Sequence, residues 1–193
     1  MSSISLIVGL GNPGKEYAQT RHNAGFWFVE QLADRYGINL KADPKFHGYS
    51  GRGQVEGHDV RLLLPTTFMN RSGQSVAPFA KFYQVAPESI LIAHDELDMD
   101  PGVIRLKTGG GHGGHNGLRD IVPHIGANFH RLRIGIGHPG AKERVSGHVL
   151  GKAPSSEQAL MDAAIAHALS QVKMLVSGQV PQAMNQINAY KPA

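Results

Sequence analysis

Five short apolar runs recur along the chain and constrain its fold more than any other feature. They span residues 4–10, 60–64, 90–93, 103–106 and 132–136. Each has the length of a strand, and most are rich in Val, Ile and Leu, which is typical of strands buried on both faces. The runs therefore predict a sheet whose strands are separated by other elements.

Stretches with helical spacing lie between these runs. Residues 26–33 and 76–83 repeat apolar side chains every three or four positions, which predicts one helix in each segment. Pro78 lies inside the second segment, where it removes a backbone donor and predicts a bend. Residues 46–55 contain three glycines and fit either a hairpin or an edge strand with bulges.

The last third of the chain has a different, more helical pattern. Ser155 begins a long run that stays helical to Gly178, and Pro181 suits the first turn of a final helix that ends near Ala189. No repeat, low-complexity tract or linker divides the sequence. We therefore expect a single domain over residues 1–193 of the α/β class, with a twisted mixed sheet flanked by helices.

Composition narrows the chemistry of the chain. Cysteine is absent, which excludes disulfides, thiolate nucleophiles and cysteine-ligated metal sites. The chain has 19 Lys and Arg against 15 Asp and Glu, and this modest excess permits a polyanionic partner such as nucleic acid. The N-terminal apolar run is too short for a signal or membrane segment. We expect a cytoplasmic protein without membrane contact.

The first apolar run ends in Gly9–Gly14, which formally matches a dinucleotide-binding fingerprint. That fingerprint needs a helix that starts at the glycines and an acidic residue at the end of a second strand. Here Pro13 removes a phosphate-facing N–H, and Asp34 falls inside a predicted helix. We therefore expect no nicotinamide cofactor.

Polar side chains follow several of the predicted strands, where ligands bind in α/β folds. His22 precedes the first predicted helix with Asn23 as its possible N-cap, so it is either a general base or a histidine without a role. Asn70 is either another N-cap or a site residue. Asp95 could accept a hydrogen bond from an imidazole and fix its tautomer, or belong to a solvated acidic turn.

Residues 109–117 form the glycine-rich segment GGGHGGHNG. So many glycines are typical of backbone that moves or closely approaches a ligand. His94, Asp95, His112 and His115 leave a metal site open as an alternative. The spacing of the last two histidines suits ligands on a helix, whereas the flanking glycines disfavour a helix there.

A serine nucleophile is a poorer alternative. The segment at residues 48–52, GYSGR, lacks the second glycine of a nucleophile elbow. The pattern that remains is a hydrolase that uses water, with one histidine base, a carboxylate that orients it, and neutral asparagine amides as donors and acceptors.

These motifs together resemble the bacterial peptidyl-tRNA hydrolases. GLGNPGxxYxxTRHNAG, TFMNxSG, HDELD, GGGHGGHNGL and RLRIGIGHP occur in that order between Leu6 and about Leu150. The resemblance implies a phosphorylase/hydrolase-like α/β fold and hydrolysis of the ester bond between a peptide and tRNA, which recycles tRNA during translation. It implies peptidyl-tRNA as the partner and neither a cofactor nor a metal, and nothing in the sequence demands more than a monomer.

The resemblance also assigns roles to individual residues. His22 would activate water, Asp95 would orient His22, and Asn12 would hold an amide near the cleaved ester. Lys107 and Arg133 match a pair that clamps the 5′-phosphate of the tRNA. Four further residues are assigned to substrate binding. Asn70 and Asn116 would bind the peptide backbone, and Tyr17 and Met69 would line the cleft.

Overall fold

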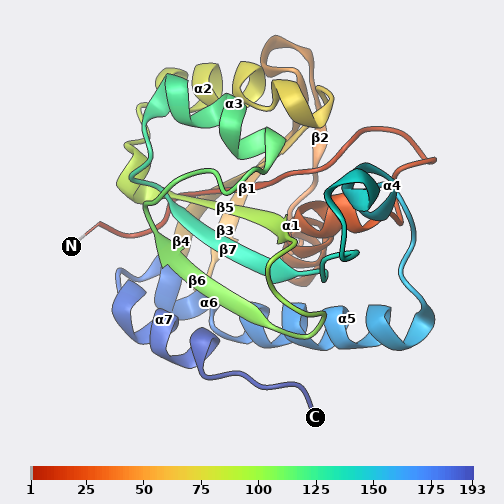
Figure 1. Cartoon of the computed structure of the whole chain (residues 1–193). Coiled ribbons are helices and arrows are strands. Elements are labelled where there is room, and N and C mark those ends of the chain that lie inside the picture. The colour runs from red at the N-terminus through yellow and green to blue at the C-terminus, as the bar shows by residue number, and fades with distance from the viewer. Residues whose placement is uncertain (1) are drawn as a thin grey trace.

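A computed structural model describes residues 2–193 and contains one seven-stranded mixed sheet (Figure 1). In sheet order the strands are β2 (Lys41–Asp43), β3 (Gly48–Val55), β4 (His58–Pro65), β1 (Leu6–Gly9), β5 (Ile90–Glu96), β7 (His130–Gly135) and β6 (Ile104–Thr108). The central strands β4, β1, β5 and β7 run parallel, and the outer strands pair antiparallel. All five predicted strands are confirmed.

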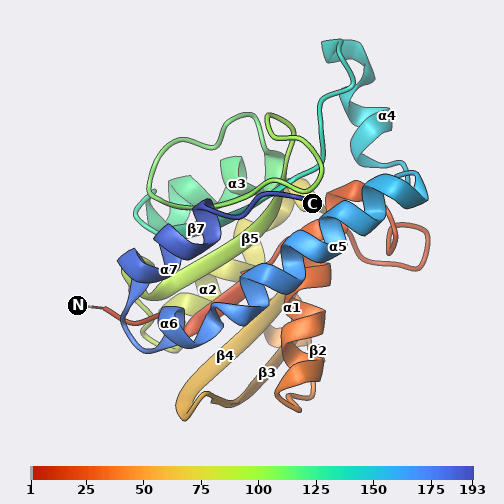
Figure 2. The same cartoon turned by 90° about the horizontal axis from the view of Figure 1, so that it is seen from below.

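Helices cover both faces of this sheet. They are α1 (Ala24–Arg35), α2 (Gly73–Phe82), α3 (Asn116–Ile125), α4 (Val145–Val149), α5 (Ser155–Ser170), α6 (Val172–Val176) and α7 (Val180–Asn188). Helices α2 and α3 pack on one face over Leu6 and Val8, while α1, α5, α6 and α7 pack on the other over Ile7 (Figures 1 and 2). The α/β class with a flanked mixed sheet is confirmed.

Two of the predicted helices differ in detail from the structure. The predicted helix over residues 155–178 is interrupted at Gln171, which separates α5 from α6. Helix α2 continues through Pro78, which removes the donor of one hydrogen bond and does not end the helix. Within residues 2–193, no helix is both long enough and apolar enough to span a bilayer.

The segment around residues 46–55 forms a hairpin strand and not an edge strand with bulges. All eight residues of β3 pair in unbroken register with β4, and the short strand β2 covers the other side of β3. Glycine is needed in β3 for close packing and not for a bulge, because a Cβ at Gly53 would lie 2.7 Å from the side chain of Ile38. Strand β2 was not predicted, since its three residues carry no apolar pattern.

Two glycines allow α1 to cross the sheet at close range. A Cβ on Gly9 would lie 2.3 Å from the carbonyl oxygen of Gly25, and a Cβ on Gly25 would lie 2.2 Å from the carbonyl oxygen of Ala93. Both obstacles are backbone atoms, which cannot move aside as a side chain does. The start of α1 is therefore fixed against the ends of β1 and β5.

We predict that Gly25→Ala lowers the free energy of unfolding by about 3 kcal/mol, because the added methyl overpacks a backbone contact. Urea denaturation followed by circular dichroism measures the change. Gly147→Ala is the matched control, since a Cβ at Gly147 meets nothing within 4 Å. Equal stability of the two variants would contradict the close approach.

Candidate active site

A cavity of about 610 Å³ opens above the carboxyl ends of the central strands. It lies between the loops that follow β1, β4 and β5 and the start of α3. Seven residues that the sequence singled out line it: Asn12, His22, Met69, Asn70, Asp95, His115 and Asn116. The structure thus brings these residues together from five separate segments of the chain.

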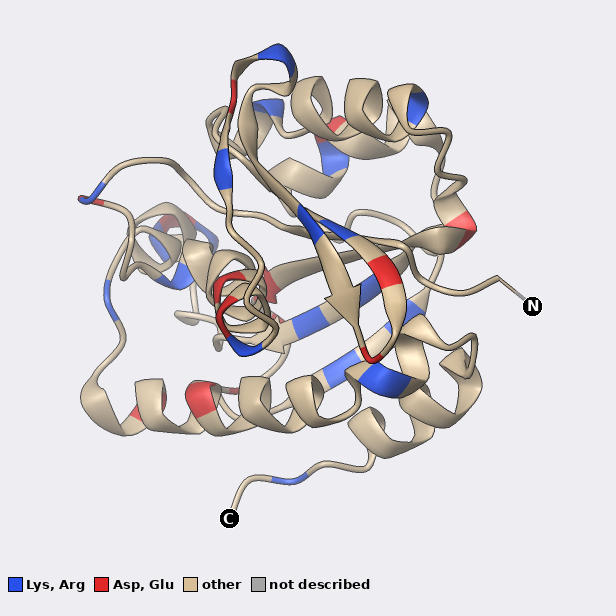
Figure 3. Ribbon diagram, turned by 180° about the vertical axis from the view of Figure 1, so that it is seen from behind, with Lys and Arg blue, Asp and Glu red and all other residues tan. Residues whose placement is uncertain are grey.

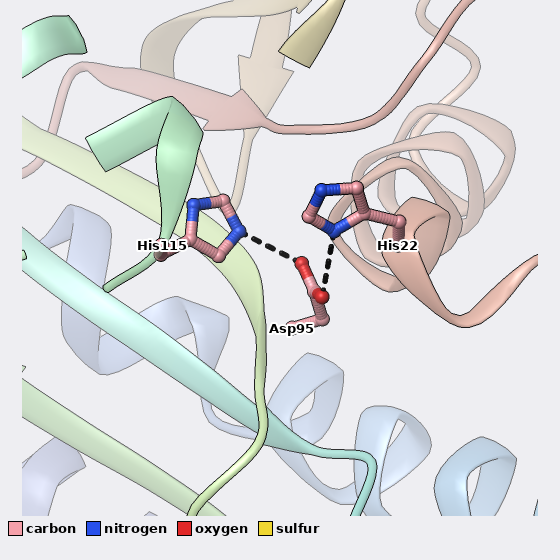
Figure 4. Close-up of side chains that lie close together, drawn as sticks. All are labelled: His22, Asp95 and His115. Carbon is pink, nitrogen blue, oxygen red and sulfur yellow. Dashed lines mark hydrogen bonds and ion pairs between the residues drawn. The ribbon is translucent and has the colours of Figure 1, made fainter. Parts of the chain in front are cut away.

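A buried carboxylate between two imidazoles forms the centre of the site (Figure 4). Nδ1 of His22 lies 2.7 Å from Oδ2 of Asp95, and Nε2 of His115 lies 2.8 Å from Oδ1 of the same residue. Because an ionised carboxylate only accepts hydrogen bonds, both imidazoles donate to it. His22 then carries its proton on Nδ1, and its Nε2 is free to accept one.

The tautomer of His115 is fixed by the backbone. Its Nδ1 accepts hydrogen bonds from the N–H groups of Gly117 (3.1 Å) and Leu118 (3.3 Å), as the N-cap of α3. A nitrogen that accepts two such bonds has no proton, so Nε2 carries the proton that is donated to Asp95. The sequence offered His115 only as a metal ligand, and its place as an N-cap directly before Asn116 was the signal that was missed.

Charge and burial set the protonation of this network. Burial alone would raise the pKa of Asp95, but the two imidazoles lower that pKa well below its usual range. For His22, burial alone would lower the pKa, and the charge of Asp95 together with its hydrogen bond outweighs burial and raises the pKa above 6.5. The pair therefore consists of a permanent carboxylate and an imidazole whose pKa is raised above its ordinary value.

His94 is buried beside this network and does not join it. Its Nδ1–H donates to the backbone oxygen of Asp95 at 2.8 Å, and its ring packs edge-on against His115 at 4.9 Å. Burial and the nearby His115 lower the pKa of His94 to about 3. His94 is therefore a neutral core residue that supports the end of β5.

Asn12 is held by a second asparagine. The amide of Asn23 accepts from the backbone N–H of Asn12 (2.8 Å) and donates to its carbonyl oxygen (3.0 Å). Oδ1 of Asn12 accepts from the backbone N–H of Met69 at 2.7 Å. Asn23 is the N-cap residue of α1, as predicted, but its side chain makes no capping hydrogen bond, because that amide fixes the loop that carries Asn12.

The other predicted substrate residues differ in exposure. Asn70 and Asn116 present exposed side chains to the cavity, and neither is an N-cap, because Asn70 lies within a short 3-10 helix (Met69–Arg71) and Asn116 is the first residue of α3. Tyr17 is not among the lining residues. Its ring packs edge-on against Phe68, whose 58% exposed side chain does line the cavity and was not predicted.

The proposed phosphate pair lies on the adjacent strands β7 and β6, at one edge of the sheet. Figure 3 shows blue Lys and Arg positions on strands of the sheet. Lys107 pairs with Arg131 across the strands and Arg133 with Arg105, so the four cations share one face. Nε of Arg133 also donates to Glu96 at 3.0 Å. Lys107 and Arg133 are thus diagonal neighbours outside the 610 Å³ cavity.

Arg131 was not predicted, and it anchors the glycine-rich loop. Its side chain is almost fully buried, and its guanidinium donates to the carbonyl oxygens of Gly110, Gly111 and Ala127. The ammonium of Lys107 packs against Gly110, where a Cβ would lie 2.7 Å from Nζ. The loop before α3 is therefore tied to the strand that carries the basic residues.

The metal alternative takes a different form in the structure. His22, Asp95 and His115 offer ligand atoms within 4.8 Å of one another, whereas Nδ1 of His112 accepts from Gly114. Binding of a metal through Nε2 of His115 would require that nitrogen to lose its proton. Because its Nδ1 already accepts two backbone N–H groups, the neutral ring cannot do so. The donor set fits an acid–base network better than a metal centre.

The fold and the imidazole–carboxylate site define an α/β protein of the hydrolase class. A family model described as peptidyl-tRNA hydrolase matches residues 6–193. The chain is 88% identical to a peptidyl-tRNA hydrolase of Acinetobacter baumannii (strain AYE), over the full length of both proteins. It is 62% identical to a peptidyl-tRNA hydrolase of Psychrobacter cryohalolentis, over 98% of both proteins. The chain belongs to the peptidyl-tRNA hydrolase family.

Solved structures agree with this assignment. The crystal structure of peptidyl-tRNA hydrolase from Acinetobacter baumannii superposes with a TM-score of 0.99 at 88% identity and covers 100% of this chain and 98% of that one. A purine nucleoside phosphorylase from Toxoplasma gondii gives a TM-score of 0.55 at 9% identity, over 93% of each chain, which shows a shared fold alone. The expected phosphorylase/hydrolase-like architecture is therefore confirmed.

We predict that Asp95→Asn moves the pKa of His22 from above 6.5 to below it. The substitution removes the charge that raises this pKa and leaves the burial that lowers it. An NMR titration of the imidazole resonances measures both values. Glu96→Gln, which removes the next carboxylate on β5, is the control and should leave His22 above 6.5; equal pKa values in the two variants would disprove the role of Asp95.

Proposed function

We propose that the chain hydrolyses the ester bond between peptide and tRNA in peptidyl-tRNA, with His22 as the general base. The observation that carries this proposal is the short contact between Nδ1 of His22 and the buried carboxylate of Asp95 inside a cavity lined by amides. Membership in the peptidyl-tRNA hydrolase family supplies the substrate class. The reaction returns tRNA to translation.

The geometry supports a direct attack by water. Nε2 of His22 takes a proton from a water molecule while Asp95 stabilises the resulting imidazolium through Nδ1–H. The hydroxide adds to the ester carbonyl and forms a tetrahedral intermediate. When the intermediate collapses, the ribose oxygen leaves and receives the proton from His22, so the products are a peptide acid and tRNA with a free hydroxyl.

Neutral amides fit the remaining tasks. Asn12 is held in place by hydrogen bonds with Asn23 and Met69, so the N–H groups of its side-chain amide can donate to the ester or to the developing oxyanion. Asn70 and Asn116 line the same cavity with exposed amides, which suit hydrogen bonds to a peptide backbone. Hydrogen bonds to the backbone do not depend on the side chains of the peptide, so one site can accept many peptides.

The tRNA part of the substrate is assigned to the basic face of β6 and β7. Lys107 and Arg133 would bind the 5′-phosphate, and Arg133 would exchange its contact with Glu96 for the phosphate. Every residue assigned here comes from one chain, so we infer that a monomer suffices. We also infer a cytoplasmic location, because that is where translation produces the substrate.

We predict that kcat/KM falls with decreasing pH along a limb whose midpoint lies above 6.5. The base must be neutral to accept a proton. Because Asp95 raises the pKa of His22 above its ordinary value, protonation of His22 removes activity at a higher pH than for an isolated histidine. Hydrolysis of N-acetyl-aminoacyl-tRNA measured from pH 5 to 8 checks this. A flat profile would remove His22 from the role of base.

We predict that His22→Ala lowers kcat by at least about 100-fold, the usual contribution of a general base. His58→Ala, an exposed histidine on β4, is the matched control and should leave kcat unchanged. EDTA should not affect the wild-type rate. Loss of activity with EDTA, restored by a divalent cation, would favour the metal alternative at His22, Asp95 and His115.

We predict that Lys107→Ala raises KM and leaves kcat nearly unchanged, because the ammonium contributes binding and not chemistry. Loss of one phosphate contact should reduce the slope of log KM against log salt by about one. Lys81→Ala, an exposed lysine on α2, is the control. A substrate without the 5′-phosphate should erase the difference between wild type and Lys107→Ala, and a pure kcat defect would contradict the clamp.

A further inference from the structure

A second cavity of about 800 Å³ lies next to the candidate active site and shares Asn12 with it. Its walls are the loop after β1, the start of α1, and the strands β2, β3 and β4. Apolar side chains such as Phe26, Tyr49 and Leu64 line it. Its volume falls within the usual range of ligand pockets, and none of the roles assigned above uses it.

The charge of this cavity is opposite to that of the basic face. Glu30 and Asp43 line it, and none of the described residues that line it is Lys or Arg. By contrast, two carboxylates (Asp95 and Glu96) and two cations (Arg119 and Lys142) line the first cavity, and four cations, of which Arg131 is buried, lie on β6 and β7. Carboxylates repel phosphates, so the second cavity disfavours RNA.

The order of the strands places the two kinds of charge on opposite sides of the reacting bond. From one edge of the sheet to the other, the basic face lies on β6 and β7, Asp95 lies at the carboxyl end of β5, Asn12 follows β1, and the second cavity lies over β4, β3 and β2. The ester joins the RNA to the peptide. If the RNA lies toward β6, the peptide extends past Asn12 toward β2.

We propose that the second cavity binds the peptide beyond its esterified residue and favours peptides with cationic or apolar side chains over anionic ones. Asn12 forms the boundary, since it lines both cavities. The apolar walls bury side chains, while Glu30 and Asp43 attract positive charge and reject negative charge. This inference rests on the proposed function, because it extends the same substrate across a neighbouring site.

The first experiment varies the peptide. Wild-type kcat/KM is measured for N-acetyl-aminoacyl-tRNA, which ends at the first cavity, and for N-acetyl-tetrapeptidyl-tRNAs that differ only in two Lys, Gln or Glu residues upstream of a common last residue. We expect the order Lys, then Gln, then Glu, with about five- to tenfold between the extremes at low salt. Absence of any order would overturn the inference.

The second experiment removes the charges. In the double variant Glu30→Gln, Asp43→Asn, the ratio of kcat/KM for Lys and Glu peptides should shrink to within about twofold. Asp43→Asn keeps an oxygen that can accept the bond from Ser50 Oγ, and each single variant should give part of the effect if the double variant folds poorly. Asp34→Asn, an exposed carboxylate on α1 outside the cavity, should keep the wild-type ratio. An unchanged ratio in the double variant would overturn the inference.

A third variant blocks the cavity without a change of charge. Ala42→Trp adds bulk at an exposed lining position, and it should raise KM for the tetrapeptidyl substrates relative to N-acetyl-aminoacyl-tRNA. Equal KM ratios in wild type and Ala42→Trp would place the peptide elsewhere. If the wild-type protein fails to cleave N-acetyl-aminoacyl-tRNA at all, the proposed function fails instead, so the two outcomes are distinguishable.

Discussion

The buried carboxylate of Asp95 is the interaction on which the site depends. A charge in this position requires donors on both oxygens, and His22 and His115 supply one N–H each. The requirement orients both rings at once. His115 can donate only through Nε2 because α3 uses its Nδ1, and His22 donates through Nδ1, so its Nε2 is directed away from Asp95. Loss of either ring would leave a buried charge partly unsatisfied.

Three different features of the fold bring Asp95, His22 and His115 together. Strand β5 is central, between β1 and β7, and it carries Asp95 at its carboxyl end. Gly9 and Gly25 let α1 begin close against the sheet, which fixes His22 just before that helix. His115 arrives on the opposite side as the N-cap of α3. Backbone packing and helix capping, which are common stabilising features, therefore also set the tautomers of the site.

Sequence patterns predicted the parts of the molecule that depend on local signals. The five apolar runs predicted β1, β4, β5, β6 and β7, and the polar context placed Asp95 after an apolar run and His22 directly before the first helix. Sequence patterns did not reveal hydrogen bonds between a side chain and the backbone of a residue distant in the sequence. Asn23 has the sequence context of an N-cap, yet its amide holds Asn12, and Arg131 reads as one cation among several although it is buried and ties down a loop. Such roles depend on which carbonyl or N–H tertiary packing brings near.

Under the proposed function, sheet order also explains how one site can bind RNA through its phosphates and the peptide backbone beside the ester through neutral amides. The cations that can recognise phosphate lie on β6 and β7, whereas the residues beside the ester are neutral amides on loops after β1 and β4 and at the start of α3. A phosphate contact gives affinity that falls with salt, while an amide contact to peptide backbone is indifferent to side chains. Because different strands hold the two sets, RNA recognition can be strengthened without narrowing the range of peptides released.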